Sequence, residues 1–137
     1  MDNKPLVEKR ADPWVYLHDG YYYFCGSVPG YKVIELRRAK KLTDLKDAEP
    51  KYIWSAHTSG PMSELIWAPE LHFWRGKWYV YFAASDDAEV RDSKHHHNIF
   101  VLEGEGDNPL TAKWSEKGQV KTHQDSFSLD PTVFEHN

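Results

Sequence analysis

A repeated pattern of proline, glycine and aromatic residues constrains the fold of this chain more than any other feature. Pro13 and Pro69 are each followed, about seven residues later, by a glycine, Gly20 and Gly76. Each glycine opens a run rich in aromatic residues, which favour β-strands. Pro131 begins a third copy, and the copies lie about 56 and 62 residues apart. Periods of about 50 residues with several strands each are typical of the blades of a β-propeller.

Each of the first two copies opens with a predicted β-hairpin. In the first copy, strand signals at 14–18 and 21–24 flank Asp19-Gly20, a dipeptide typical of two-residue hairpin turns. In the second, strand signals at 71–74 and 77–82 flank Arg75-Gly76. A helical turn is predicted only within 40–48, because Pro50 ends it. Further strands are predicted at 33–37, 52–54 and 98–102 and, in the third copy, at 133–134.

The third copy is cut short. Its turn glycine would fall one residue past Asn137, so we expect the chain to end within the first hairpin of a third blade. Propellers have about four to eight blades, so two blades and a partial third do not close a ring. We interpret the chain as the N-terminal part of one propeller domain, with blade I at about 10–60, blade II at about 61–125 and the start of blade III at 126–137. A complete two-sheet β domain is the alternative.

Composition argues against several classes of protein. The chain has 137 residues and a formal net charge of −4, which opposes binding to nucleic-acid phosphates. No apolar run is long enough for a membrane helix. The first ten residues lack the apolar core of a signal peptide, which favours a cytoplasmic protein, with secretion as the alternative. The lone cysteine, Cys25, excludes an intrachain disulfide and is expected to be a buried structural thiol.

Two aspartates occupy the same position of the repeat. Asp12 and Asp130 directly precede the prolines of the first and third copies, where the second copy has Ala68. We expect an extended backbone before proline, and we expect the two carboxylates to converge at one end of the central channel. Paired carboxylates that face a cavity suit glycoside hydrolysis, in which one activates water and one protonates the leaving oxygen. The alternative for each aspartate is a turn or a strand cap.

Several motifs together resemble glycoside hydrolase family 43, and within it the branch of exo-acting α-1,5-L-arabinofuranosidases. The motifs lie at 10–15 (RADPWV), 20–24 (GYYYF), 34–39 (IELRRA), 66–72 (IWAPELH) and 125–130 (DSFSLD). The resemblance implies an all-β, five-bladed propeller. It also implies that a complete protein removes terminal α-L-arabinofuranosyl units from arabinan or arabino-oligosaccharides by an inverting mechanism.

The resemblance also implies roles for single residues. Asp12 matches the general base that activates water, and Asp130 matches the residue that orients the general acid and raises its pKa. The general acid is a glutamate of a later blade, usually followed by Gly-Pro, and no residue here matches it. We therefore expect the chain alone to be inactive. No cofactor is required, and a structural calcium beside a late-blade histidine is possible only in the complete propeller.

Five further residues are candidates for the substrate pocket. Trp67 would stack on a sugar ring, with a blade-to-blade contact as the alternative. Arg10 would pair with a channel carboxylate and keep Asp12 ionised, with a surface position as the alternative. The full set of substrate-binding candidates is Arg10, Trp67, Glu70, Phe127 and Leu129.

The stretch from 86 to 97 is rich in acidic residues and ends in three histidines. Adjacent residues of a strand point to opposite faces, so three consecutive imidazoles do not converge on one metal ion. The acidic residues lack the spacing and the glycine of a calcium-binding loop. We therefore expect no metal site here, and we expect a solvated loop that leads into a strand.

Two other functions remain open at this point. A non-catalytic carbohydrate-binding propeller fits the aromatic content and the missing general acid. A protein-interaction propeller fits the fold but leaves the paired aspartates unexplained. The expected partner is an arabinose-containing oligo- or polysaccharide, and the choice among arabinan, arabinoxylan and xylo-oligosaccharides stays open.

Overall fold

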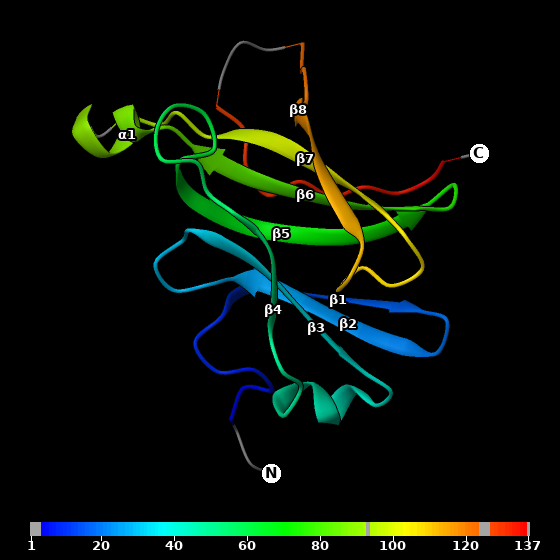
Figure 1. Ribbon diagram of the computed structural model, residues 1–137. Coiled ribbons are helices and arrows are strands. Elements are labelled where there is room, and N and C mark those ends of the chain that lie inside the picture. The colour runs from blue at the N-terminus through cyan, green and yellow to red at the C-terminus, as the bar shows by residue number, and fades with distance from the viewer. Residues whose placement is uncertain (1–3, 93, 124–126, 137) are drawn as a thin grey trace.

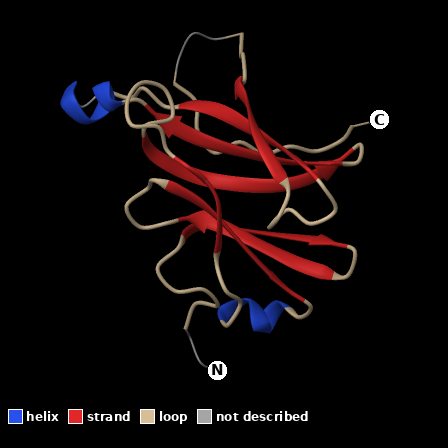
Figure 2. Cartoon of the chain, viewed as in Figure 1, coloured by secondary structure: helices blue, strands red, loops and turns tan. Residues whose placement is uncertain are grey.

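The computed structural model describes residues 4–92, 94–123 and 127–136, and its strands form two four-stranded antiparallel sheets. Each sheet is a meander in which every strand pairs with the next one along the chain. The first sheet contains β1 (Ala11–His18), β2 (Tyr21–Ser27), β3 (Val33–Ala39) and β4 (Lys51–Ser55). The second contains β5 (Glu64–Trp74), β6 (Lys77–Ser85), β7 (Asn98–Glu105) and β8 (Lys113–Gln119). Figures 1 and 2 show the two sheets stacked on each other.

The two predicted hairpins are confirmed, and their turns have the same geometry. Asp19 and Gly20 have φ of 47° and 74°, and Arg75 and Gly76 have φ of 48° and 79°. Two successive residues with positive φ define the type I′ turn, whose twist matches that of the flanking strands. Glycine occupies the second position of each turn because it adopts positive φ without steric cost.

The described residues also contain two short helices. A 3-10 helix, η1 (Leu42–Lys46), lies within the predicted segment 40–48 and buries Leu45. The α-helix α1 (Asp87–Asp92) follows β6 at one end of the second sheet, where a solvated loop was expected (Figure 1). No helix in the described ranges has the length and apolar character that crossing a membrane requires.

The residue before each repeat proline is not extended, so that prediction was wrong. The φ angles of Asp12, Ala68 and Asp130 are 50°, 44° and 52°, all in the left-handed region. The first strands are bulged here, with register shifts between Ala11 and Trp14 in β1 and on both sides of Trp67 in β5. A bulge re-aims the side chains of a strand, which overrides the local preference of a residue before proline. The three copies therefore share an irregular backbone conformation.

The predicted strand at 133–134 is absent from the described C-terminal segment, 127–136. A strand needs a hydrogen-bonded neighbour, and none of the described residues supplies the second strand of this hairpin. Residues Val133, Phe134 and Glu135 instead line a groove with side chains of β1, β5 and β6: Tyr16, His72, Phe73, Trp74 and Tyr81. Residues 125 and 126 of the resemblance motif lie outside the described residues.

Aromatic side chains fill the contact between the sheets. Trp78 of β6 is fully buried, and its ring lies 4.9 Å from His18, 5.2 Å from Tyr23 and 4.7 Å from Phe73, centroid to centroid. Trp14 Nε1 of β1 donates a hydrogen bond of 2.9 Å to the carbonyl oxygen of Leu71 in β5. The first strand of one sheet thus contacts the first strand of the next, as adjacent blades of a propeller do.

Cys25 is a buried thiol, as predicted. Its side chain is fully buried on β2, and Sγ donates to the carbonyl oxygen of Pro69 at 2.9 Å. Burial raises the pKa of this thiol well above its ordinary range. Cys25 therefore stays protonated and contributes to the packing of the two sheets.

Candidate active site

Asp12 lies near the start of β1, and a buried serine ties it to the second sheet. Ser27 Oγ, at the end of β2, donates a hydrogen bond of 2.8 Å to Asp12 Oδ2. Ser27 Oγ also accepts a hydrogen bond of 2.9 Å from the backbone nitrogen of Ala68. Ser27 is 3% exposed, whereas Asp12 is exposed to solvent. Ser27 therefore links the two repeat-equivalent positions, Asp12 and Ala68, and holds one oxygen of the candidate general base.

Asp130 lies in the C-terminal segment and is exposed. Its φ of 52° is close to the 50° of Asp12, so both residues that precede a repeat proline have a positive φ. The segment is joined to the second sheet by Ser128, whose backbone nitrogen donates to the carbonyl oxygen of His97 at 2.9 Å. Within the described ranges, no hydrogen bond or ion pair joins the two aspartates directly.

Trp67 lies between the two bulges of β5 and is partly buried. One face of its indole stacks on the ring of His97, with centroids 4.0 Å apart and planes 19° apart. Tyr31, from the β2–β3 connection, approaches edge-on at 6.2 Å. His97 lies directly before β7 of the sheet that contains Trp67, whereas the edge contact with Tyr31 joins the two blades. Stacking of Trp67 on a sugar ring stays a prediction. Its Nε1 is buried and has no hydrogen-bond partner among the described residues.

Arg10 is paired with a carboxylate that the sequence analysis did not single out. Its Nη2 lies 2.7 Å from Oε2 of Glu35 on β3, and Arg37 Nε lies 2.8 Å from Oε1 of the same residue. Glu35 is 1% exposed, and two guanidinium groups satisfy its buried charge. This buried cluster fixes the segment that leads into Asp12. An acidic residue inside the apolar run Val33-Ile34-Glu35-Leu36 was the signal that could have revealed it.

The other pocket candidates lie on β5 and on the C-terminal segment. Glu70 Oε2 lies 3.2 Å from Nε2 of His72, two residues further along β5. The ring of Phe127 lies 5.2 Å from that of His95, and Phe127 is 53% exposed. Leu129 is also exposed. Phe127 and Leu129 precede Asp130 in the C-terminal segment, while Glu70 follows Trp67 on the same strand.

The acidic stretch before the three histidines is organised, so the expectation of a solvated loop was wrong. Glu89 is 8% exposed, and its Oε2 accepts hydrogen bonds from Ser85 Oγ at 2.6 Å and from the backbone nitrogen of His96 at 2.8 Å. The same oxygen lies 2.8 Å from Nδ1 of the fully buried His97, without the alignment of a hydrogen bond. Burial raises the pKa of Glu89, but these donors outweigh it and hold the pKa below its ordinary value.

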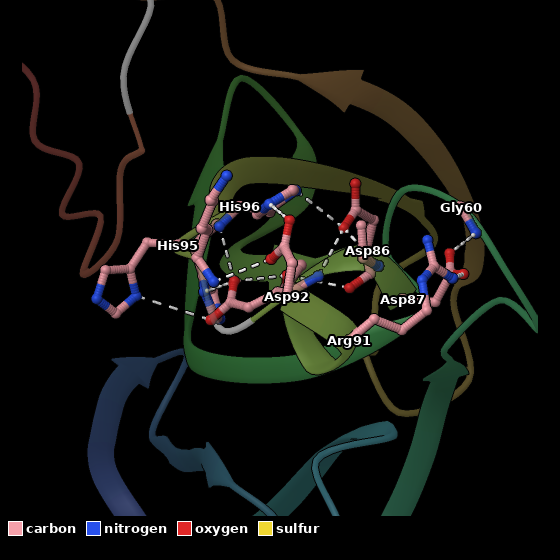
Figure 3. A network of polar contacts seen from close by, with 12 residues as sticks. Gly60, Asp86, Asp87, Arg91, Asp92, His95 and His96 are labelled. Carbon is pink, nitrogen blue, oxygen red and sulfur yellow. Dashed lines mark hydrogen bonds and ion pairs between the residues drawn. The ribbon is translucent and has the colours of Figure 1, made fainter.

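Figure 3 shows how the remaining side chains of this stretch pair with one another. His96 lies between two carboxylates, with Nδ1 3.2 Å from Asp86 and Nε2 3.3 Å from Asp92. Asp87 accepts a hydrogen bond of 3.0 Å from the backbone nitrogen of Gly60 and pairs with Arg91. In the sequence, the close spacing of acidic residues and histidines within 86–97 was the signal that could have revealed these pairs. In residues 4–92, 94–123 and 127–136, no group of three or more His, Cys, Asp or Glu side chains has an arrangement that could hold a metal ion.

Comparison with known proteins finds one family match and two relatives over nearly the whole chain. The sequence profile of the glycosyl hydrolases family 43 matches residues 3–137. An extracellular exo-α-(1→5)-L-arabinofuranosidase of Streptomyces avermitilis is 53% identical over 95% of this chain and 26% of its own length. The protein of the same name from Streptomyces chartreusis is 48% identical over 96% of this chain and 39% of its own length. This chain therefore spans only part of the relatives that it matches.

Solved structures support the fold. A crystal structure of an α-L-arabinofuranosidase from Lactobacillus brevis has a TM-score of 0.86 and 50% identity, over 96% of this chain and 42% of that one. The Cellvibrio cellulosa α-L-arabinanase has a TM-score of 0.62 at 20% identity, over 93% of this chain and 41% of that one, and shows likeness of fold alone. The predicted fold, all-β with about two blades of a five-bladed propeller, is confirmed.

Proposed function

Because the chain belongs to glycosyl hydrolase family 43, we propose that it is the N-terminal part of an inverting glycosidase that removes terminal α-L-arabinofuranosyl units from arabinan or arabino-oligosaccharides. The observation that carries this proposal is the shared left-handed backbone of Asp12 and Asp130 at the same repeat position. We call the five-bladed protein that this chain would begin the complete propeller. In it, blade I spans about 10–60, blade II about 61–125, and blade III starts at 126.

In the proposed reaction, Asp12 acts as the general base. A water molecule gives its proton to the Asp12 carboxylate, and its oxygen forms a bond to the anomeric carbon of the sugar. The bond between that carbon and the leaving oxygen breaks, and the general acid of a later blade protonates that oxygen. The Ser27 hydroxyl supports this role, because a hydrogen bond to one carboxylate oxygen stabilises the ionised form and fixes its direction.

Asp130 is proposed to act on the general acid. A second carboxylate at the same level of the channel disfavours ionisation of a nearby glutamic acid and so raises its pKa. The acid then keeps the proton that the leaving oxygen needs. The chain alone contains no residue that matches this acid, so we propose that it releases no arabinose by itself.

The pocket is proposed to form around Trp67, Glu70, Phe127 and Leu129, and its ligand to be an arabinose-containing oligo- or polysaccharide. Arg10 supports the pocket indirectly, because its guanidinium holds the buried Glu35 next to the start of β1. We also propose a secreted protein rather than a cytoplasmic one. The two Streptomyces relatives, whose names include the word extracellular, support that location.

Two measurements test the proposal. Sequencing the coding DNA past Asn137 is expected to show further aromatic blades and a glutamate before Gly-Pro. Proton NMR of arabinotriose hydrolysis by the complete propeller is then expected to show the β-anomer of arabinose first, because inversion of an α-linkage gives β. If the α-anomer formed first, the inverting mechanism would be wrong. If no arabinose were released, the assignment as a glycoside hydrolase would be wrong.

A second candidate is a carbohydrate-binding propeller fragment without catalysis, which the aromatic content of the chain, 15%, favours. It predicts that this chain alone binds arabinotriose. Isothermal titration calorimetry at millimolar ligand would show saturable heat in that case. Heat no greater than that of dilution would exclude it.

A further inference from the structure

We propose that His97 is a positioning residue that sets the orientation of Trp67, and through it the affinity of the pocket for its sugar. This inference rests on the proposed function, in which Trp67 contacts the substrate. His97 lies directly before β7, at the end of the three histidines, and is fully buried. Its ring is nearly parallel to the indole, at a centroid distance of 4.0 Å and an interplanar angle of 19°.

His97 also contacts the backbone that carries Trp67. Its Nε2 lies 3.1 Å from the carbonyl oxygen of Leu65, two residues before Trp67. Leu65 has a φ of 51° and lies within the first bulge of β5. One imidazole therefore fixes both the bulged backbone and the indole that projects from it. A side chain held at two points in this way keeps one rotamer.

The other ring nitrogen of His97 faces an anchored carboxylate. Nδ1 lies 2.8 Å from Oε2 of Glu89, and Ser85 and the backbone of His96 hold that oxygen with bonds of 2.6 and 2.8 Å. Contacts at Leu65 on one side and Glu89 on the other prevent the imidazole from turning. Ser85 thus holds Glu89, Glu89 lies against His97, and His97 in turn stacks on Trp67.

The position of His97 links two parts of the proposed pocket. Its ring contacts Trp67, while its carbonyl oxygen accepts the hydrogen bond from Ser128, two residues before Asp130. The imidazole covers one face of the indole, so we propose that the sugar meets the opposite face. Without the imidazole, the indole can rotate into the space that it leaves, and the contact surface for the sugar is lost.

Steady-state kinetics of the complete propeller on arabinotriose test this inference. His97→Ala is expected to raise KM about tenfold, because the indole loses the orientation in which it contacts the sugar, and even a misplacement of about 1 Å can cost up to about 10²-fold in rate. His97→Phe keeps a flat ring against the indole and is expected to hold KM within about threefold of wild type. His96→Ala is the matched control, because His96 pairs with Asp86 and Asp92 and its backbone bond to Glu89 is kept.

A role of His97 in folding alone gives a different result. If His97 acts in folding alone, His97→Ala lowers the fraction of active protein, and therefore the apparent kcat, but leaves KM unchanged. An unchanged KM in His97→Ala, or an equal rise in KM in His97→Phe, would overturn the inference.

A second readout does not depend on turnover. Fluorine NMR of protein labelled with 5-fluorotryptophan is expected to show a shifted Trp67 signal in His97→Ala and an unshifted one in His96→Ala. The signal is assigned by its loss in Trp67→Phe. If wild-type protein releases no arabinose but the Trp67 signal moves, the proposed function fails while the contact holds. If arabinose is released and neither the signal nor KM changes, the positioning role fails alone.

Discussion

The hydroxyl of Ser27 donates a hydrogen bond of 2.8 Å to the carboxylate of Asp12. The same hydroxyl accepts the backbone N–H of Ala68, which occupies in the second sheet the repeat position that Asp12 occupies in the first. The packing of one blade on the next and the direction of the candidate general base therefore depend on one buried side chain. Loss of the Ser27 hydroxyl should therefore affect both stability and catalysis.

We predict that Ser27→Ala lowers the free energy of unfolding of the complete propeller by about 1–3 kcal/mol, because the buried N–H of Ala68 loses its acceptor. It should also lower kcat, since Asp12 loses the donor that directs it. Urea unfolding and the rate on arabinotriose measure the two effects. Ser55→Ala, at an exposed position at the end of β4, is the control. Equal unfolding midpoints for the two variants would contradict this account.

Trp78→Ala is expected to destabilise the contact between the sheets by about 3–5 kcal/mol, the usual cost of removing a large buried aromatic side chain. Trp78 is fully buried and contacts the rings of His18 and Tyr23 from the first sheet. Trp74→Ala serves as the control, because Trp74 is 44% exposed. Thermal unfolding compares them, and similar melting temperatures would show that the sheets do not depend on this ring.

The buried Glu89 should make stability dependent on pH. Its pKa in the folded state is lowered, so its ionised form stabilises the fold above its ordinary pKa of 4.5. This contribution is lost as the pH falls through the lowered value, because the carboxyl is then protonated in both the folded and the unfolded state. Urea unfolding of wild type and Glu89→Gln should therefore differ most near neutral pH and converge in acid. A difference that is constant with pH would refute this role.

The regular part of the fold could be predicted from local signals. The pairs Asp19-Gly20 and Arg75-Gly76 specify type I′ turns, and the aromatic runs beside them specify the paired strands. The strand β8 was missed because most of its side chains are exposed, so its sequence carries no apolar alternation. The prediction of an extended backbone at Asp12 was also wrong, because a bulge depends on the pairing of two strands and not on the residue before proline alone.

The sequence singled out candidate site residues only where the repeat or the family resemblance pointed to them. Asp12 was singled out by its repeat position, and Trp67 by the resemblance. The supporting contacts were not, because Ser27, Glu35 and His97 reach them only through long-range packing. A charged or polar residue inside an apolar run marks such a position in the sequence, but it does not identify the partner.

The activity of Asp12→Asn in the complete propeller tests the central claim most directly. The amide keeps an oxygen that can accept the hydrogen bond of Ser27, so the fold should be preserved while the base is lost. We predict that kcat on arabinotriose falls by about 10²–10⁴-fold, with a KM close to that of wild type. Asp19→Asn is the matched control, because Asp19 has a similar φ of 47° but lies exposed in a hairpin turn. Near-normal turnover by Asp12→Asn would contradict the assignment of Asp12 as the general base.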